Sequence, residues 1–146
     1  MIFKRPVDEL FKINSKFGLR KHPVTGEDKM HWGSDFAAPE GTYIFACHDG
    51  DIISAKNHRQ FGNYILHLVL LNGVRYFLFY CHLSEFFVRE NIMGDYPYER
   101  VKKGDVIGKV GSTGTSTGPH LHFQICKESA LASLYTRNAL DPELFF

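Results

Sequence analysis

The sequence YILHLVLLNGVRYFLFYCH at residues 64–82 decides the fold, because it has the pattern of a long β-hairpin. Apolar residues, many of them aromatic or β-branched, run up to Asn72-Gly73 and resume directly after it. Such residues favour strands, and Asn-Gly between apolar runs is typical of the two-residue type I′ turn. We therefore expect two long antiparallel strands, with His82 at the end of the second strand, at the rim of a sheet.

Shorter segments on both sides of this hairpin also have the composition of strands and turns. Residues 43–47 and 52–55 flank Asp49-Gly50, a dipeptide that favours hairpins, so they predict a second pair of strands. Residues 101–110 alternate between apolar and polar residues on both sides of a turn, and this pattern predicts a short hairpin or strand pair.

Helices are expected only near the ends of the chain. Residues 7–16 place apolar side chains on one side of a short amphipathic turn or helix. Residues 129–135 predict one short helix, and residues 141–144 predict a closing turn. The fold class that follows is mainly β, an antiparallel β-sheet domain with short peripheral helices.

Length and composition exclude several classes of protein. The 146 residues suit a single domain that buries a core without disulfides, and Cys47, Cys81 and Cys126 are expected to be buried, reduced thiols. A formal charge of +1 without long runs of one sign argues against a nucleic-acid partner. No apolar run approaches the roughly 20 residues of a membrane span, and the N-terminus lacks a secretory signal.

Polar residues that end strands or flank glycine turns are the candidates for a functional site. His31 and Asp35 stand four residues apart around Gly33, which favours a strand end over a helix. His120 and His122 would share one face of a strand. Together with His82 they offer a His/His/Asp set for a catalytic zinc ion, which needs three protein ligands, and two further histidines for proton transfer and oxyanion stabilisation.

Three motifs in order give the sequence a family resemblance. They are His31-x-Gly33-x-Asp35, Tyr80-Cys81-His82 and Gly118-Pro119-His120-Leu121-His122-Phe123. With Phe17-Gly18-x-Arg20, residues 101–108 and Asp141-Pro142, the chain resembles the lysostaphin-type, LytM-like zinc endopeptidases that cut peptidoglycan cross-bridges. The resemblance runs from about Phe17 to the end, so it implies a barrel-sandwich-like catalytic core at residues 17–146 with an N-terminal extension at residues 1–16.

The resemblance also implies roles for the site residues. His31, Asp35 and His122 would hold one zinc ion, while His82 and His120 would activate water or stabilise the tetrahedral intermediate, without a fixed division between the two. The family usually has Glu after His-x-His-Phe, and here Gln124 takes that place. The change removes no ligand but could alter a supporting hydrogen bond.

The substrate groove is expected on the central sheet, with tyrosines along it. Tyr80 is expected to line the groove, and Tyr96 and Tyr98 to rim it. Its walls are expected at four segments, residues 20–31, 56–62, 84–100 and 111–118.

The expected function is zinc-dependent hydrolysis of peptide cross-links in bacterial peptidoglycan, by a protein that acts on the cell wall. An inactive LytM-like domain that binds or regulates the cell wall is the first alternative, but such a domain is expected to lack a ligand. A phosphotransfer carrier is the second, and it leaves His31 and Asp35 without a role. The protein is expected to be a monomer or part of a larger virion or cell-wall assembly. The missing signal suggests a trimmed chain or a phage-type lysin.

Overall fold

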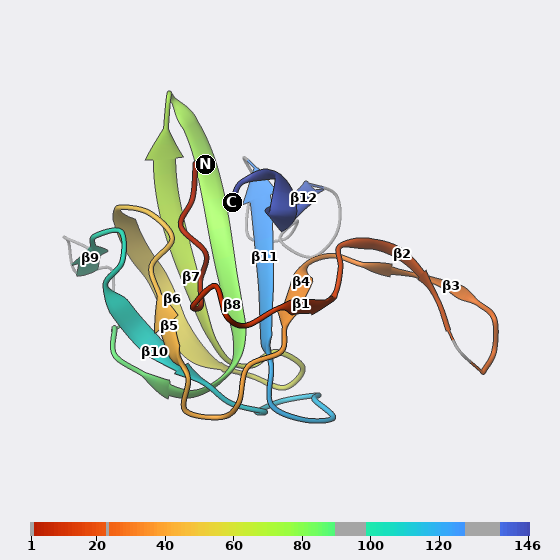
Figure 1. Ribbon diagram of the computed structural model, residues 1–146. Helices are drawn as coiled ribbons and strands as arrows, with labels where there is room; N and C mark the ends of the chain where they lie inside the picture. The colour runs from red at the N-terminus through yellow and green to blue at the C-terminus, as the bar shows by residue number, and fades with distance from the viewer. Residues whose placement is uncertain (1, 23, 90–98, 128–137) are drawn as a thin grey trace.

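The computed structural model describes residues 2–22, 24–89, 99–127 and 138–146. Ten strands of these residues form one antiparallel sheet, which is built around the central strand β8 (Figure 1). Its main path runs in the order β1-β4-β11-β8-β7-β6-β9, with β10, β5 and β12 attached beside it. The strand bounds are β1 Ile13–Ser15, β4 Ser34–Phe36, β5 Tyr43–Phe45, β6 Gly50–His58, β7 Gly62–Leu71, β8 Val74–Phe86, β9 Glu99–Val101, β10 Val106–Val110, β11 Leu121–Lys127 and β12 Ala139–Leu140.

The expected hairpin is confirmed as the pair β7 and β8. Leu71 and Val74 are register partners across the two-residue turn. Asn72 and Gly73 have φ values of 51° and 78°, and a type I′ turn needs positive φ at both positions. The turn therefore sets the register of the two longest strands of the sheet.

β8 does not end at His82 as expected, but continues to Phe86. His82 has a φ of 68°, in the left-handed region, and the pairing of β8 with β7 shifts by one residue there. β8 pairs with β11 up to Cys81 and with β10 from Leu83 onward. His82 thus lies in a β-bulge where the strand changes partner, and bulges of this kind redirect a side chain.

Two of the expected strand pairs are wrong, because longer-range pairing takes their place. β5 pairs with β10, while β6 pairs with β7 and β9, so Asp49-Gly50 connects two strands that do not pair with each other and forms no hairpin. β9 and β10 likewise pair with other strands and not with each other. Ile44 on β5 and Ile107 on β10 are fully buried, so core burial favours the observed partners.

The N-terminal residues form the expected turn and no helix, because the Phe11 N–H donates to the Asp8 carbonyl oxygen at 3.0 Å. They belong to the same core as the rest of the chain. Phe3 and Val7 are buried in that core, and the Phe3 ring stacks on Phe145 at a centroid distance of 5.4 Å. β1 pairs with β4. At the other end, the expected closing turn is a 3₁₀ helix at Pro142–Leu144, and residues 129–135 lie outside the described residues.

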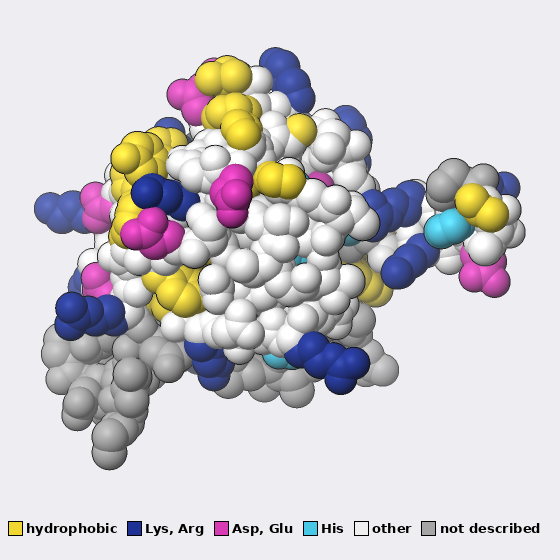
Figure 2. All heavy atoms as spheres, turned by 90° about the horizontal axis from the view of Figure 1, so that it is seen from below, with side chains coloured by type: hydrophobic (Ala, Val, Ile, Leu, Met, Phe, Trp, Pro, Cys, Tyr) yellow, Lys and Arg dark blue, Asp and Glu magenta, His cyan; other side chains and the backbone are white. Residues whose placement is uncertain are grey.

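A two-stranded ribbon of β2 (Gly18–Lys21) and β3 (Asp28–His31) projects from the body of the domain. The space-filling view from below shows it as an arm that stands away from the rest (Figure 2). Gly18 and Arg20 of the motif Phe17-Gly18-x-Arg20 therefore lie on the strand β2. The ribbon matters for function because β3 ends at His31.

The central sheet carries apolar residues on both faces. One face bears the larger core cluster, which includes Tyr80, Phe123 and Ile125. The other face bears a smaller cluster with Phe79 and Cys126. All three cysteines are buried and free, as expected. Within the described parts of the chain, no helix has the length and apolar character needed to cross a membrane.

Candidate metal centre and catalytic groove

Adjacent strands bring the acidic residue and one histidine of the site together. Asp35 on β4 and His122 on β11 are direct register partners, so their side chains lie on the same face of the sheet. His31 ends β3 just before β4 begins, which carries its imidazole to the same place. Sheet pairing, and not a flexible loop, therefore positions this group.

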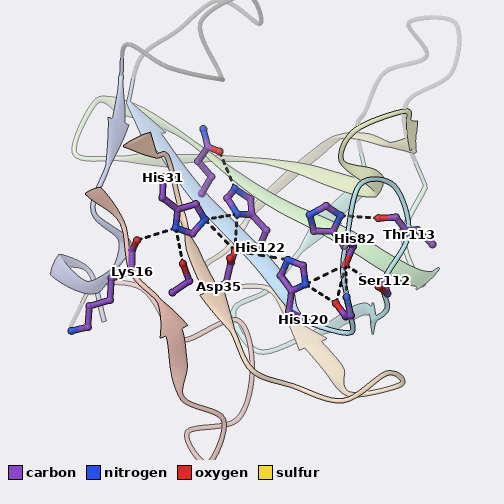
Figure 3. Close-up of polar contacts among 12 residues, drawn as sticks. Lys16, His31, Asp35, His82, Ser112, Thr113, His120 and His122 are labelled. Carbon is purple, nitrogen blue, oxygen red and sulfur yellow. Dashed lines mark hydrogen bonds and ion pairs between the residues drawn. The ribbon is translucent and has the colours of Figure 1, made fainter. Parts of the chain in front are cut away.

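Three potential ligand atoms converge in this group (Figure 3). The Nδ1 atom of His122 lies 2.8 Å from Oδ1 of Asp35. The Nε2 atom of His31 lies 3.2 Å from Nδ1 of His122 and 3.3 Å from the same Asp35 oxygen. Ligand atoms bound tetrahedrally to zinc at its usual bond lengths lie about 3.3 Å apart, so this spacing fits a zinc ion.

The outer hydrogen bonds of the two imidazoles decide which nitrogen of each remains available. Nδ1 of His31 donates to the carbonyl oxygen of Lys16 at 2.9 Å, because a carbonyl oxygen can only accept. Nε2 of His122 donates to the side-chain oxygen of Gln124 at 3.2 Å. The opposite nitrogen of each neutral ring then points a lone pair at the carboxylate of Asp35. Three acceptors that face one another repel unless a cation lies between them, so the donor set fits a metal ion.

The carboxyl group of Asp35 is held in its charged form. Burial raises its pKa, but without a metal ion the nitrogens of His122 and His31 that face it can carry protons, and their hydrogen bonds and charges then outweigh burial, so the net shift is downward. An ionised carboxylate is the form that binds a metal.

His82 and His120 form a second pair of imidazoles beside this group. Their ring centroids lie 4.8 Å apart. Nδ1 of His82 donates to the carbonyl oxygen of Thr113 at 2.7 Å, and Nδ1 of His120 donates to that of Gly118 at 2.8 Å. Both side chains line the groove, so Nε2 is the nitrogen that each leaves for substrate. Burial lowers the pKa of His82, and its bond to Thr113 opposes this only in part.

All five residues line one groove of about 660 Å³. The described residues around it are Arg20, Lys29, Met30, His31, Trp32, Asp35, His58, Gln60, Phe61, His82, Thr115, His120, His122 and Gln124. The expected walls at residues 20–31, 56–62 and 111–118 therefore contribute to it. Tyr96, Tyr98 and residues 90–98 lie outside the described residues.

Tyr80 does not line the groove, which corrects the expectation. It is a register partner of Phe123 and lies on the opposite face of the sheet from His122. Its side chain is fully buried, and its hydroxyl accepts a hydrogen bond from the Cys47 backbone at 3.2 Å. The prediction failed because it assumed regular alternation from Tyr80 to His82, and the bulge at His82 breaks that alternation.

Several groove residues lie in the expected wall segments but were not predicted individually. Arg20 and Lys29 come from the projecting ribbon, and His58 comes from the end of β6. The backbone carbonyls that orient the imidazoles, such as that of Thr113, carry no side-chain signature that a sequence could reveal. The ribbon residues could have been found by noting that Lys29 and His31 share a face of any strand that ends at His31.

Known proteins resemble this chain in both sequence and fold. The model of Peptidase family M23 matches residues 29–142. Peptidoglycan DD-endopeptidase ShyA of Vibrio cholerae is 39% identical over 121 residues, which cover 82% of this chain and 26% of ShyA. This chain spans about a quarter of the length of the Vibrio cholerae endopeptidases that it matches.

Two solved structures extend the likeness to three dimensions. A zinc-containing peptidase from Vibrio cholerae has a TM-score of 0.76 at 35% identity, covering 97% of this chain and 39% of that chain. The catalytic domain of lysostaphin from Staphylococcus simulans has a TM-score of 0.74 at 35% identity, covering 93% and 92%. The lysostaphin-type resemblance and the antiparallel β fold are thereby confirmed, and the chain belongs to peptidase family M23.

Proposed function

We propose that this domain is a zinc-dependent endopeptidase that hydrolyses peptide cross-links of bacterial peptidoglycan. The observation that carries the proposal is the convergence of His31 Nε2, His122 Nδ1 and Asp35 Oδ1 within 3.3 Å of one another. Relatives named as peptidoglycan DD-endopeptidases and the likeness to lysostaphin support the substrate class.

His31, Asp35 and His122 would hold one zinc ion. When bound, zinc supplies Lewis acidity, which lowers the pKa of water and polarises a peptide carbonyl. Lys16 and Gln124 keep the two imidazoles turned so that their lone pairs face the ion. Such supporting hydrogen bonds fix the tautomer and the orientation of a ligand.

His82 and His120 would move protons and bind the developing oxyanion. Because each donates from Nδ1 to a backbone carbonyl, the neutral ring presents an unprotonated Nε2 to the groove. That nitrogen can accept a proton from the attacking water. The resulting N–H can then donate to the oxyanion or to the leaving amine.

The two alternative functions explain less of the site. A binding or regulatory domain without catalysis needs neither the complete ligand set nor a second imidazole pair, yet this groove has both. A phosphotransfer carrier needs one reactive histidine and gives no role to the contact between His122 and Asp35.

The place of action follows from the substrate. We place the domain at the bacterial cell wall, in an extracellular, periplasmic or virion-associated setting, as a monomer or as part of a larger assembly. Its partner there is the peptide of peptidoglycan.

Metal content and cell-wall lysis together test the proposal. Purified protein should contain about one zinc ion per chain by elemental analysis, and it should reduce the turbidity of purified cell walls. A chelator should abolish both signals, and added zinc should restore them. No bound metal after zinc supplementation, or lysis that is indifferent to the chelator, would overturn the proposal.

A further inference from the structure

Two cations face each other on the side of the ribbon that leads to the candidate metal centre. Arg20 on β2 and Lys29 on β3 are direct register partners. Lys29 and His31 are two residues apart on one strand, so they share a face of the ribbon. Both cations line the same groove as the site histidines. Basic side chains are visible along the arm where it leaves the body (Figure 2).

This arrangement costs stability unless an anion compensates for it. Like charges directly opposite each other on paired strands are destabilising. The neighbouring pair of the ribbon, Lys21 and Asp28, has opposite charges, but it lies on the other face. Within the described ranges, neither Arg20 nor Lys29 forms an ion pair with a carboxylate. The ribbon therefore matches its charges on the face away from the groove and leaves two cations unmatched on the face toward it.

Arg20 is also held close to a candidate metal ligand. One of its Nη atoms donates to the hydroxyl of Ser15. That hydroxyl lies 3.5 Å from Nδ1 of His31, so a single hydroxyl group separates the guanidinium from the imidazole. Arginine has five N–H donors in a planar fork that matches a carboxylate. The contact with Ser15 fixes the fork and leaves its other donors for a ligand.

The described lining of the groove offers no free carboxylate that could pair with Arg20 or Lys29. Asp35 is the one carboxylate among its described lining residues, and it is engaged by His122 and His31. A bound dication would make the groove more positive still. Complementarity of charge therefore favours a substrate that carries an anion into this part of the groove.

We propose that Arg20 and Lys29 form a subsite for a free carboxylate of the peptide substrate, near the bond that is cut. This inference rests on the proposed peptidase function and specifies its substrate. The enzyme then prefers cross-links whose residues carry a free carboxylate over neutral cross-links such as glycine bridges or amidated peptides.

Two synthetic cross-linked peptides test this subsite, identical except that the carboxylate beside the scissile bond is free in one and amidated in the other. The wild type should cleave the free acid with a kcat/KM higher by on the order of 10- to 100-fold, as charge-assisted hydrogen bonds predict. Arg20→Gln and Lys29→Gln should each remove most of this preference, by slowing cleavage of the acid and not of the amide. Lys21→Gln, on the other face of the same ribbon, is the matched control and should keep the preference.

A binding measurement separates recognition from catalysis. Metal-free wild-type protein should bind the free acid more tightly than the amide by calorimetry, and Arg20→Gln should bind both alike. Equal kcat/KM values for acid and amide in the wild type would overturn the subsite and leave the peptidase function standing. If the wild type cleaved neither peptide and also failed to cleave cell walls, the result would instead contradict the peptidase function itself. A parallel loss on both peptides in Arg20→Gln would show a structural role and would also overturn the subsite.

Discussion

His122 and Asp35 are register partners on neighbouring strands, and Nδ1 of His122 lies 2.8 Å from Oδ1 of Asp35 although 87 residues separate them in the chain. The contact is therefore made by the hydrogen-bonded ladder between β11 and β4. A site built on paired strands is held more rigidly than one built on loops. Removing one of its side chains should change the chemistry of the site and leave the sheet in place.

The two histidines of the His-x-His pair should respond differently to substitution. His122→Ala removes a proposed ligand, so it should lose both bound zinc and activity. His120→Ala removes only a proton carrier, so it should keep zinc while activity falls by at least about 100-fold, the usual size of a general acid–base contribution. Zinc stoichiometry and kcat/KM on a cross-linked peptide measure the two effects. Equal zinc loss in both variants would show that the roles of the pair are divided wrongly.

Gln124 should support metal binding through His122. Gln124→Met keeps the length of the side chain but removes the oxygen that accepts from Nε2 of His122. Loss of such a supporting hydrogen bond typically weakens metal affinity by roughly 10- to 100-fold. Gln124→Glu is the control, because it keeps an acceptor at the same place and should retain the affinity. Competition with a chromophoric chelator measures the zinc dissociation constant, and equal constants for wild type and Gln124→Met would refute the prediction.

Local pattern allowed the central hairpin and the converging polar residues to be predicted. Asn72-Gly73 fixes a turn by its own backbone preference, and this holds whatever the rest of the chain does. His31 and Asp35 flank a glycine, and His120 and His122 alternate on one strand, so short-range geometry was enough to group them. The family resemblance then assigned the roles, which the spacing alone left open.

Long-range pairing and local irregularity could not be predicted from the sequence. The choice of β10 as partner for β5 depends on which apolar faces fit together in the core, and Asp49-Gly50 carries no information on that choice. The bulge at His82 reversed the expected orientation of Tyr80, and nothing in Tyr80-Cys81-His82 marks it. The like-charged pair of Arg20 and Lys29 emerged only when the ribbon register was known.

Gly33 should be required at its position because β4 passes close to β11 there. A Cβ atom on Gly33 would lie 2.5 Å from the Phe123 carbonyl oxygen and 2.8 Å from Cε1 of His122. The carbonyl is part of the sheet and cannot move away, so Gly33→Ala should destabilise the fold by about 1 to 3 kcal/mol and displace the His122 ring. Because His122 is a proposed zinc ligand, displacing its ring should also lower the affinity for zinc.

Chemical denaturation and zinc titration of Gly33→Ala measure these two effects. Gly118→Ala is the stability control, because a Cβ there would meet no atom within 4 Å. Wild-type stability and wild-type zinc affinity in Gly33→Ala would contradict the close approach of the two strands.

His67 should make the fold sensitive to acid. Its side chain is fully buried on β7, with Nδ1 3.3 Å from the Tyr80 hydroxyl and Nε2 without a hydrogen-bond partner among the described residues. Burial lowers the pKa of His67 to about 3, whereas a histidine in the unfolded chain has a pKa near 6.5. Between these two values the unfolded chain binds more protons, so the free energy of unfolding falls as the pH falls. His67→Leu removes this titration, while Tyr80 keeps its bond from Cys47. Between pH 7.5 and pH 5.0 the wild type should therefore lose about 2 kcal/mol more of its unfolding free energy than His67→Leu does. Urea denaturation of both proteins at the two pH values measures this difference, and equal losses would mean that His67 is protonated inside the fold.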